Sequence, residues 1–437
     1  MMRASHLVGG IALLTLVLAL GVAALLDPAR LTPDPDSIAL EISIAFVLTF
    51  LVILVVRYVL LLWLGYLQHI ENRGRSHDRM SEPPVTIVVP VYNEEAVIAV
   101  ALRSLLSLRY SRFDVIVVDD GSTDDTAACA AALAGEYGST TIRVVSKKNG
   151  GKASALNTGI ALARTPYVLC MDGDSRLHPE TLHYAMRHFT DARVGAVAGN
   201  VKVVNRGNVW TRLQALEYIE GLNLARRAQG FLRVVNIIPG PVGVFRRDAL
   251  VGVGGYDTDT FAEDADVTLK LLTAGWHIAY EERAIAYTEA PETYLDLVKQ
   301  RYRWTRGILQ ALRKRASWLG TPRRGVAVWL SLLVMLFEAV LWPALNVVGN
   351  SLFTIAALSA GVAGGVFYWW VLLTMLDVAA ALYAVGMEGE DLRLVPYAVP
   401  YRFFFITMID VAKLLATAEE VARVRMSWGK LERVGRL

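Results

Sequence analysis

The sequence predicts an α/β domain with a mostly parallel sheet, set between groups of membrane-spanning α-helices. The chain has 437 residues and is 54% hydrophobic, above the roughly 45–50% apolar residues of average soluble proteins. Its apolar residues concentrate at 7–67 and 325–417. Between these regions, short β-branched runs alternate with amphipathic helical patterns, which is typical of a sheet covered by helices on both faces.

The composition also limits the classes of function. The formal net charge is only +3, which argues against nucleic acid as the main partner. Cys129 and Cys170 lack metal-ligand spacing and suggest a reducing compartment without a disulfide framework. We expect four regions: an N-terminal membrane region with two spans at 1–80, a globular domain at 81–292, an amphipathic region at 293–324, and a C-terminal membrane region of about four spans with a basic tail at 325–437.

The N-terminal region contains two apolar stretches. Residues 8–26 approach the ~20 residues that a bilayer requires, although a cleavable signal peptide is an alternative because Arg3 precedes the run. Residues 42–66 form a stronger span, interrupted by Arg57. Since Lys/Arg excess beside a span marks the cytoplasmic side, the basic segment 69–79 predicts that the globular domain faces the cytoplasm.

The globular domain alternates strands and helices. Strands are predicted at 85–90, 113–118, 142–145, 167–171 and 196–204, and helices after residue 97, after the capping residue Asp124, at 153–163, near 209–229 and from 261 onwards. Three of the first four strands end in polar turns containing Gly or Asp. Because ligands of open α/β sheets bind at the carboxyl ends of the strands, these turns are expected to share one crevice.

The strand at 167–171 ends in Asp172 and Asp174, with Gly173 between them. Two close carboxylates suit a hard divalent cation that also binds phosphate oxygens, as Mg²⁺ does. Taken alone, the pair is more typical of a solvated turn. The acidic run at 261–266 likewise has a structural explanation, because the helix macrodipole favours carboxylates in the first turn by about 0.3–1 kcal/mol each.

The C-terminal part of the chain is predicted to contain an interfacial helix and further membrane spans. Residues 293–315 form an amphipathic helix with basic residues opposite an apolar stripe, which indicates a helix along the inner membrane surface. Residues 325–349 then span. Residues 351–386 are too long for one simple span, and the small residues at 360–365 predict a break into two short helices. With a last span at 396–417 and a basic tail inside, the sequence predicts six spans.

Six charged residues lie within these spans. Charges in a bilayer face a partner or an aqueous path, so ion pairing and a conduit for a polar product are both open. The six residues are Arg57, Glu338, Asp377, Arg402, Asp410 and Lys413.

Five polar motifs follow one another along the chain: Asp119-Asp120, Lys152, Asp172-x-Asp174, Glu263-Asp264 and Gln300-x-x-Arg303-Trp304. In this order the chain resembles inverting family 2 glycosyltransferases of the membrane-embedded, processive type, which include hyaluronan, chitin-oligosaccharide, cellulose and poly-N-acetylglucosamine synthases. The likeness covers roughly residues 84–310 by motif. The turn at 151–153 and the segment 245–247 look closest to the poly-N-acetylglucosamine synthases.

The resemblance implies a GT-A-like, Rossmann-like domain on the cytoplasmic face of a bacterial inner membrane. It assigns the nucleotide-sugar to Val91, Tyr92, Glu94, Asp119, Asp120, Lys152, Asp172 and Arg303. Tyr92 would offer a stacking face, and Arg303 could pair with the diphosphate in bidentate fashion. Asp174 and Asp172 would hold Mg²⁺ or Mn²⁺, with Asp174 expected as the direct ligand.

The resemblance also assigns catalysis and acceptor binding. Asp264 matches the general base, which removes the proton of the attacking hydroxyl. The common family form is Thr-Glu-Asp, and here Ala262 replaces the threonine. Trp304 would be the platform for the terminal sugar, since indole combines a large apolar face with one donor, although Trp is also common as an interfacial anchor. The acceptor residues are Glu263, Gln300, Trp304, Gly240 and Pro241.

The expected activity is transfer of a sugar from a UDP-sugar to the non-reducing end of a growing β-linked polysaccharide, which is extruded across the bilayer. The expected sugar is N-acetylglucosamine, and the expected donor is UDP-N-acetylglucosamine. A small membrane accessory subunit is also implied. One alternative is a single transfer to a membrane lipid acceptor. Another, from a different class, is an inactive membrane scaffold that binds sugar nucleotides.

Overall fold

The computed structural model describes residues 38–74, 82–322, 325–361 and 363–424. These residues form two compact units. The sheet unit comprises Leu61–Glu292 and Gln310–Leu333, and the helical unit comprises 38–60, Thr293–Leu309 and 334–424. Four predicted features lie outside the described residues: the span at 8–26, residues 75–79 of the basic segment, Arg323-Arg324 and most of the basic tail.

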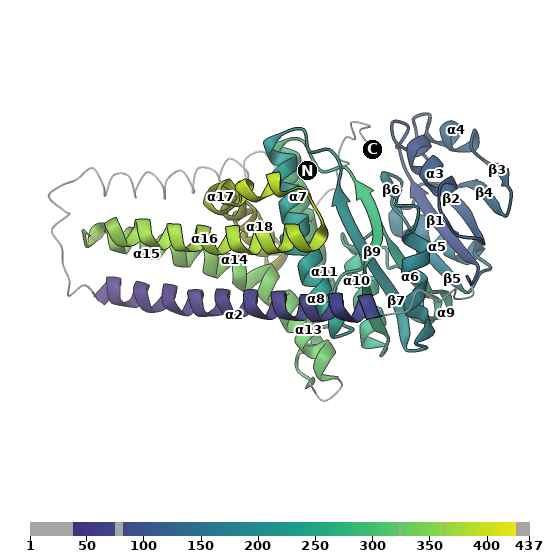
Figure 1. Ribbon diagram of the computed structural model, residues 1–437. Coiled ribbons are helices and arrows are strands. Elements are labelled where there is room, and N and C mark those ends of the chain that lie inside the picture. Colours follow the sequence, from purple (N-terminus) through teal and green to yellow (C-terminus); the bar gives the residue numbers. More distant parts are fainter. Residues whose placement is uncertain (1–37, 75–81, 323–324, 362, 425–437) are drawn as a thin grey trace. The chain divides into compact units, whose positions relative to one another are not determined.

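The sheet unit is built on nine described strands, most of which are labelled in Figure 1. Their order across the sheet is β3-β4-β2-β1-β5-β8-β7-β9-β6. The strands are β1 (Val85–Val91), β2 (Phe113–Asp119), β3 (Gly135–Tyr137), β4 (Thr140–Ser146), β5 (Tyr167–Cys170), β6 (Ser175–Leu177), β7 (Val194–Val203), β8 (Gly243–Arg246) and β9 (His277–Thr288).

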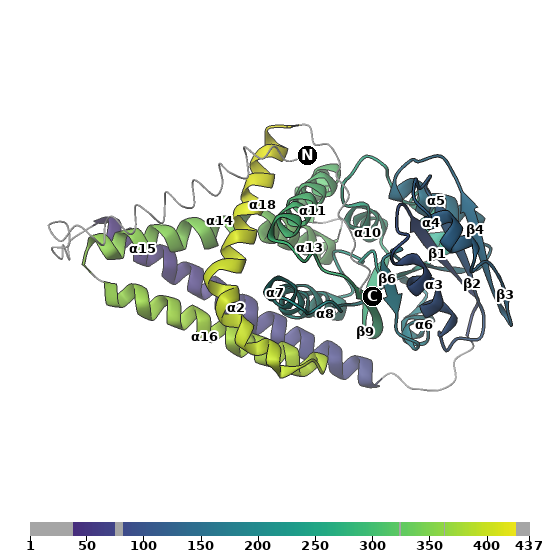
Figure 2. The ribbon, with the colours of Figure 1, turned by 90° about the horizontal axis from the view of Figure 1, so that it is seen from above.

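The first half of the sheet is parallel, as predicted. Strand β1 pairs in parallel with β2 and β5, and β2 pairs in parallel with β4. Every residue of β1 is buried, which fits a central strand covered on both faces. Figure 2 shows α5 (Lys152–Leu162) and α3 (Ile98–Leu106) on opposite faces of these strands. The carboxyl ends of β1, β2 and β5 therefore meet at one edge.

The second half of the sheet is mixed. Strand β8 runs antiparallel to both β5 and β7, while β7 and β9 are parallel. The short strands β3 and β6 are also antiparallel to their neighbours. Strands β3, β6, β8 and β9 were not predicted. The first three have only three or four residues, and such short runs carry little periodicity. Strand β8 matters for the site, since it carries the preceding turn to the end of β5.

The helices after Asp124, near 209–229 and from 261 onwards form as predicted, whereas the short helices at Thr181–Met186, Arg187–Thr190 and Arg247–Gly252 were not predicted. The long helix near 209–229 consists of three consecutive segments, with a π-helical stretch in the middle. Asn208 begins it with a capping box, accepting from the Thr211 backbone N–H at 2.9 Å. The other elements are α4 (Thr126–Ala131), α6 (Thr181–Met186), η2 (Arg187–Thr190), α7 (Val209–Glu217), η3 (Tyr218–Asn223), α8 (Leu224–Phe231), α9 (Arg247–Gly252) and α10 (Glu263–Thr273).

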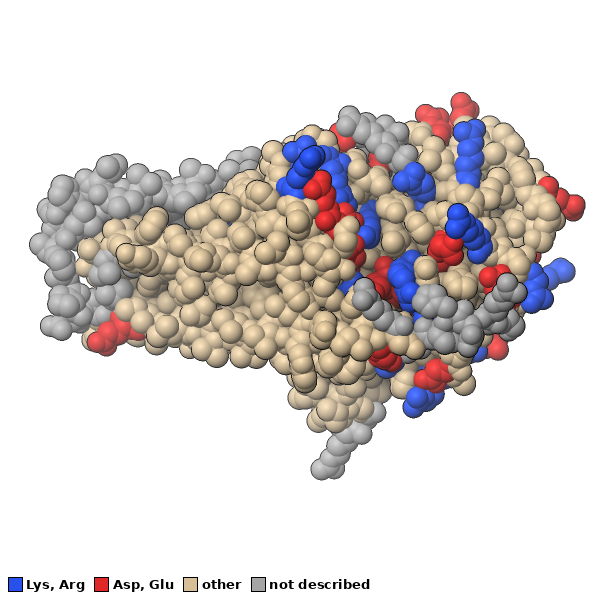
Figure 3. All heavy atoms as spheres, viewed as in Figure 1, with Lys and Arg blue, Asp and Glu red and all other residues tan. Residues whose placement is uncertain are grey.

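Three helices in the described part of the chain are long and apolar enough to cross a membrane: Glu41–Asn72, Val326–Ser359 and Val366–Glu388. Their apolar side chains are strongly exposed, for example Ile42 at 66% and Trp63 at 59%, as lipid-facing residues are expected to be. On the face drawn in Figure 3, the helices of the helical unit show a nearly uncharged surface. The chain is therefore a membrane protein.

The C-terminal helices differ from the prediction in one respect. The break falls where expected, since Gly361 adopts a left-handed φ of +73°. However, the residues before it do not form a separate short helix. They continue the span that begins at Val326, because π-helical turns at Phe337–Leu341 and Leu345–Gly349 accommodate Pro343 without ending the helix.

The last predicted span, 396–417, is helical but is not among the three candidates. The elements after Leu319 are α13 (Val326–Leu336), η5 (Phe337–Leu341), α14 (Trp342–Ala344), η6 (Leu345–Gly349), α15 (Asn350–Ser359), α16 (Ala363–Glu388), η7 (Leu392–Tyr397), α17 (Ala398–Pro400), η8 (Tyr401–Phe405) and α18 (Ile406–Val421). Earlier in the chain lie α2 (Ile38–Gly74), α11 (Tyr294–Lys314) and α12 (Ala316–Leu319).

All six charged residues of the spans are paired with one another. Arg57 donates to Glu338 at 3.0 Å, the Arg402 guanidinium forms a two-point contact with the Asp377 carboxylate, and Lys413 lies 3.6 Å from Asp410. Buried charges are tolerated when they are paired in this way. These contacts confirm the ion-pair interpretation, and the conduit stays a prediction.

Candidate active site

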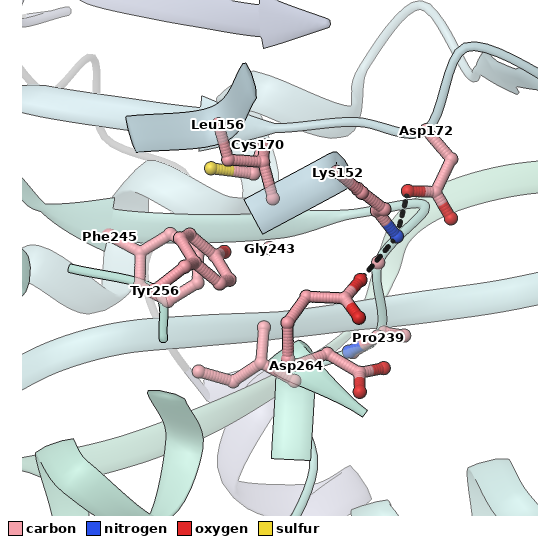
Figure 4. A pocket seen from close by; sticks show the side chains of 12 residues that line it. Lys152, Leu156, Cys170, Asp172, Pro239, Gly243, Phe245, Tyr256 and Asp264 are labelled. Atoms are coloured by element: carbon pink, nitrogen blue, oxygen red, sulfur yellow. Dashed lines mark ion pairs between the residues drawn. The ribbon is translucent and has the colours of Figure 1, made fainter. Parts of the chain in front are cut away.

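A narrow pocket lies at the carboxyl edge of the sheet, where four segments meet (Figure 4). Asp172 follows β5, Lys152 begins α5, and Glu263 and Asp264 begin α10. The fourth segment is the turn before β8. The full lining is Lys152, Leu156, Cys170, Asp172, Ile238, Pro239, Gly240, Gly243, Phe245, Tyr256, Glu263 and Asp264. Five residues predicted from sequence therefore share one pocket: Lys152, Asp172, Gly240, Glu263 and Asp264.

Lys152 joins the two acidic motifs. Its Nζ lies 2.7 Å from Asp172 Oδ1 and 2.8 Å from Glu263 Oε1, as the dashed lines of Figure 4 mark. Burial lowers the pKa of Lys152, but the charges of Asp172 and Glu263 outweigh it and raise this pKa well above 10.5. Lys152 is thus a fixed cation, placed where a diphosphate would need charge balance.

The carboxylates outnumber this cation. Burial raises the pKa of Asp172, and the neighbouring carboxylate of Asp174 adds to the rise while Lys152 opposes it. Asp174 is itself 6% exposed. No cluster of three or more possible metal-ligating side chains occurs among the described residues. Two hard oxygen ligands with surplus negative charge fit a cation that takes its other ligands from phosphate and water.

Asp264 is a partly buried carboxylate whose pKa is raised. Burial, followed by the charge of Glu263, raises the pKa of Asp264 from 3.8 to about 6. The backbone N–H of Ala265 donates to Asp264 Oδ1 at 2.8 Å and holds the side chain at the start of α10. A general base is most effective when its pKa lies near the working pH. A carboxylate with a pKa of about 6 would meet that condition.

Gly240 is required by close packing in this pocket. A Cβ at this position would lie 2.7 Å from Asp172 Oδ2 and 3.0 Å from Lys152 Nζ. Any side chain would therefore displace the ion pair at the pocket mouth. Gly173 is similarly constrained, because its Cβ would meet Val91 Cγ1 at 2.8 Å, which explains the glycine between the two aspartates.

The rear of the pocket is apolar. Leu156, Cys170, Phe245 and Tyr256 form it, and each is at most 6% exposed. Burial raises the pKa of the Cys170 thiol to about 12, so this cysteine is a packing residue and not a nucleophile. Asn157 fixes the position of Tyr256, accepting from its backbone N–H at 2.9 Å and donating to its carbonyl at 2.7 Å.

The residues predicted to contact the nucleotide lie at the ends of β1 and β2. Asn93 adopts a left-handed φ of 51°, and its Oδ1 accepts from the Thr123 backbone N–H at 2.8 Å, which joins the two loops. Tyr92 is 37% exposed and Val91 is buried. The nucleotide-contact roles of Val91, Tyr92 and Glu94 stay predictions.

The two aspartates at the end of β2, Asp119 and Asp120, have partners within the protein. Asp119 Oδ1 accepts from the Ser122 backbone N–H at 3.1 Å. Asp120 accepts from the backbone N–H of Gly151 at 2.7 Å and pairs with Lys147 at 2.6 Å. Asp120 therefore holds the glycine turn that precedes Lys152. The sequence did not identify Lys147, and nucleotide contacts of both aspartates stay predictions.

The acceptor motif belongs to α11 in the helical unit. The Arg301 guanidinium lies 4.1 Å from the Trp304 ring centroid, and it donates to Gln300 Oε1 at 2.5 Å. Arg301, which is only 2% exposed, thus orients two of the predicted acceptor residues. The five sequence motifs do not include Arg301, although an arginine three residues before a tryptophan on a helix signals such a contact. Convergence of Gln300, Arg303 and Trp304 with the pocket stays a prediction, as do the acceptor role of Pro241 and the role of Arg303 toward the diphosphate.

The parallel strands, the acidic edge and the fixed lysine together define a GT-A-type glycosyltransferase domain. A family described as "Glycosyltransferase like family 2" matches residues 83–307. The chain belongs to glycosyltransferase family 2.

Curated relatives agree with this family. Poly-beta-1,6-N-acetyl-D-glucosamine synthase of Staphylococcus aureus (strain COL) is 34% identical over 263 residues, which cover 59% of this chain and 62% of the relative. The enzyme of the same name from Staphylococcus epidermidis is 33% identical over 258 residues, which cover 59% of this chain and 61% of the relative. The chain thus spans about 62% of the length of the curated relatives it matches.

A solved structure supports the fold. The mannosyltransferase PcManGT from Pyrobaculum calidifontis, in complex with GDP-Man and Mn²⁺, superposes with a TM-score of 0.61 at 22% identity. The match covers 89% of this chain and 100% of that one.

Proposed function

We propose that this protein transfers N-acetylglucosamine from UDP-N-acetylglucosamine to the non-reducing end of a growing β-linked polysaccharide. The observation that carries the proposal is the meeting of Asp172, Lys152 and Asp264 around one pocket in a family 2 glycosyltransferase domain. The sugar and a β-1,6 linkage are inferred from the names of the staphylococcal relatives. The catalytic domain would face the cytoplasm of a bacterial inner membrane, with a small accessory subunit as a possible component.

The chemistry follows from the positions of the side chains. Lys152 balances the charge of the diphosphate and keeps Asp172 oriented through their ion pair. Asp264 takes the proton of the acceptor hydroxyl as that oxygen attacks the anomeric carbon from the side opposite UDP, so the configuration inverts. Such proton transfer typically contributes about 10²–10⁴-fold in rate.

Asp172 and Asp174 would hold a divalent cation, Mg²⁺ or Mn²⁺. When bound, that ion neutralises charge developing on the leaving UDP. Trp304 and Gln300 would bind the acceptor end, and the chain would extrude its product past the spans of the helical unit. Processive growth and export belong to the proposal.

The experiment is incubation of the purified full-length protein, in lipid nanodiscs, with a panel of radiolabelled UDP-sugars and Mg²⁺ or Mn²⁺. The proposal predicts label from UDP-N-acetylglucosamine in a large product that a β-1,6-specific hexosaminidase degrades. A product that stops after one sugar would instead support transfer to a lipid acceptor. No UDP release with any donor would support an inactive scaffold.

A further inference from the structure

Helix α11 ends at a lysine that contacts three carboxylates. Lys314 Nζ lies 3.0 Å from Asp257 Oδ2 and 3.2 Å from Asp266 Oδ2, and it also pairs with Asp259. All of these residues belong to the sheet unit. Lys314 lies beyond residue 307, where the family match ends, and it belongs to none of the five sequence motifs.

The partners of Lys314 flank the general base on both sides in sequence. Asp257 and Asp259 lie on the loop that leads into Glu263-Asp264, and Asp266 lies in the first turn of α10, two residues after the base. A further contact joins the same two segments, because Gln310 Oε1 accepts from the Phe261 backbone N–H at 3.1 Å. The end of α11 therefore holds the loop immediately before Asp264 as well as the helix turn after it.

The ion-pair cluster around Lys314 is held in place because its central carboxylate, Asp266, is buried. The side chain of Asp266 has no exposed surface, and Arg315 lies 3.6 Å from its Oδ1. Lys270 adds a contact within the same cluster, donating to Asp257 Oδ1 at 2.7 Å and to the Gly255 carbonyl at 2.8 Å. Removing one cation would leave a buried carboxylate without a full set of partners, which is destabilising locally.

We propose that Lys314 is a positioning residue for the glycosyl-transfer step: it fixes the loop 257–262 and the start of α10 so that the Asp264 carboxylate faces the acceptor hydroxyl. Lys314 is not among the described residues that line the pocket, so it acts through Asp257, Asp259 and Asp266. The proposal rests on the proposed function, because it takes Asp264 as the base.

The test compares Lys314→Met with Lys314→Arg in the full-length protein. Hydrogen exchange of the peptide covering 257–264 is measured together with kcat and the donor KM. A displacement of about 1 Å at a catalytic group can cost about 10²-fold. Lys314→Met should therefore lower kcat by about 10–100-fold and speed exchange of this peptide, while the donor KM changes by less than about threefold. Lys314→Arg, which keeps the positive charge, should restore most of the kcat and most of the protection of this peptide from exchange.

Two further variants serve as control and as a milder perturbation. Arg193→Met removes an exposed cation, 73% accessible, that pairs with Asp191 at 3.0 Å, and it should leave exchange and kcat unchanged because exposed pairs contribute little. Asp259→Asn removes one partner of Lys314 at a position that is 69% exposed, so it tests the proposal even if Lys314→Met does not fold. It should give a smaller effect in the same direction.

Unchanged exchange at 257–264 in the Lys314→Met or Asp259→Asn variant would overturn the proposal. So would a kcat within about twofold of wild type, or a loss of kcat that Lys314→Arg does not restore. Exchange does not depend on the donor, and kcat is measured with whichever UDP-sugar the wild type turns over. A wild type inactive with UDP-N-acetylglucosamine therefore contradicts the proposed function, and not this inference.

Discussion

Replacing Asp264 by asparagine should strongly slow turnover and at the same time stabilise the protein. Burial and the Glu263 charge raise the pKa of Asp264 from 3.8 to about 6. For a carboxyl group whose pKa is raised on folding, the stabilising form is the protonated one. Its contribution is complete below about pH 4 and is lost as the pH rises through about 6.

The size of this effect follows from the two pKa values. One pKa unit corresponds to about 1.36 kcal/mol, so the ionised carboxylate costs at most about 3 kcal/mol above pH 7. Asp264 keeps part of its surface exposed, which reduces the expected gain in unfolding free energy for Asp264→Asn to about 1–3 kcal/mol. At about 2–4 °C per kcal/mol, the melting temperature should rise by about 2–12 °C.

The assay is thermal unfolding of wild type and Asp264→Asn at pH 7.5, without donor or added metal, beside UDP binding and UDP release. We expect a higher melting temperature, retained UDP binding and a rate lower by about 10²–10⁴-fold. Asp248→Asn, which removes an exposed carboxylate of the same unit, should change none of these. A lower melting temperature with normal turnover would refute both the strained carboxylate and its role as base.

Three more predictions follow from the pocket. The kcat/KM of the wild type should fall as the pH drops through about 6, because the protonated Asp264 cannot accept a proton; a pH–rate profile that is flat between 5 and 8 would contradict this. Gly240→Ala should weaken UDP-sugar binding by at least about 10-fold in calorimetry, since its Cβ would lie 2.7 Å from Asp172 Oδ2, whereas Gly252→Ala, with no atom within 4 Å, should bind normally. Chelation with EDTA should stop UDP release and added Mn²⁺ or Mg²⁺ should restore it, because Asp172 and Asp174 offer oxygen ligands; persistent activity in EDTA would count against a metal at these residues.

The sequence predicted the part of the fold that local patterns determine. Strands β1, β2, β4 and β5 were expected from β-branched runs, and their parallel order follows from the helices between them. Because parallel strands bring their carboxyl ends together, the proximity of Lys152 to Asp172 could be expected as well. The order of strands in the second half of the sheet could not be predicted from the sequence, because β8 inserts antiparallel between β5 and β7 through long-range pairing.

Contacts between segments that are distant along the chain also could not be predicted from the sequence. Lys147 and Lys314 carry no motif, and their partners Asp120 and Asp266 are far away along the chain. The predicted division of the C-terminal spans at residue 350 failed for a related reason. A π-helical turn lets a helix pass a proline, and nothing in the local sequence distinguishes this from a helix end.

The central claim is that Asp172, Lys152 and Asp264 surround one nucleotide-sugar. A structure of the full-length Asp264→Asn variant with UDP-N-acetylglucosamine and Mn²⁺ tests this most directly. The account predicts the diphosphate beside Lys152 and the Asp172–Asp174 pair, with the sugar between that pair and residue 264. A donor bound away from these three side chains, or a sugar whose anomeric carbon faces away from residue 264, would contradict it.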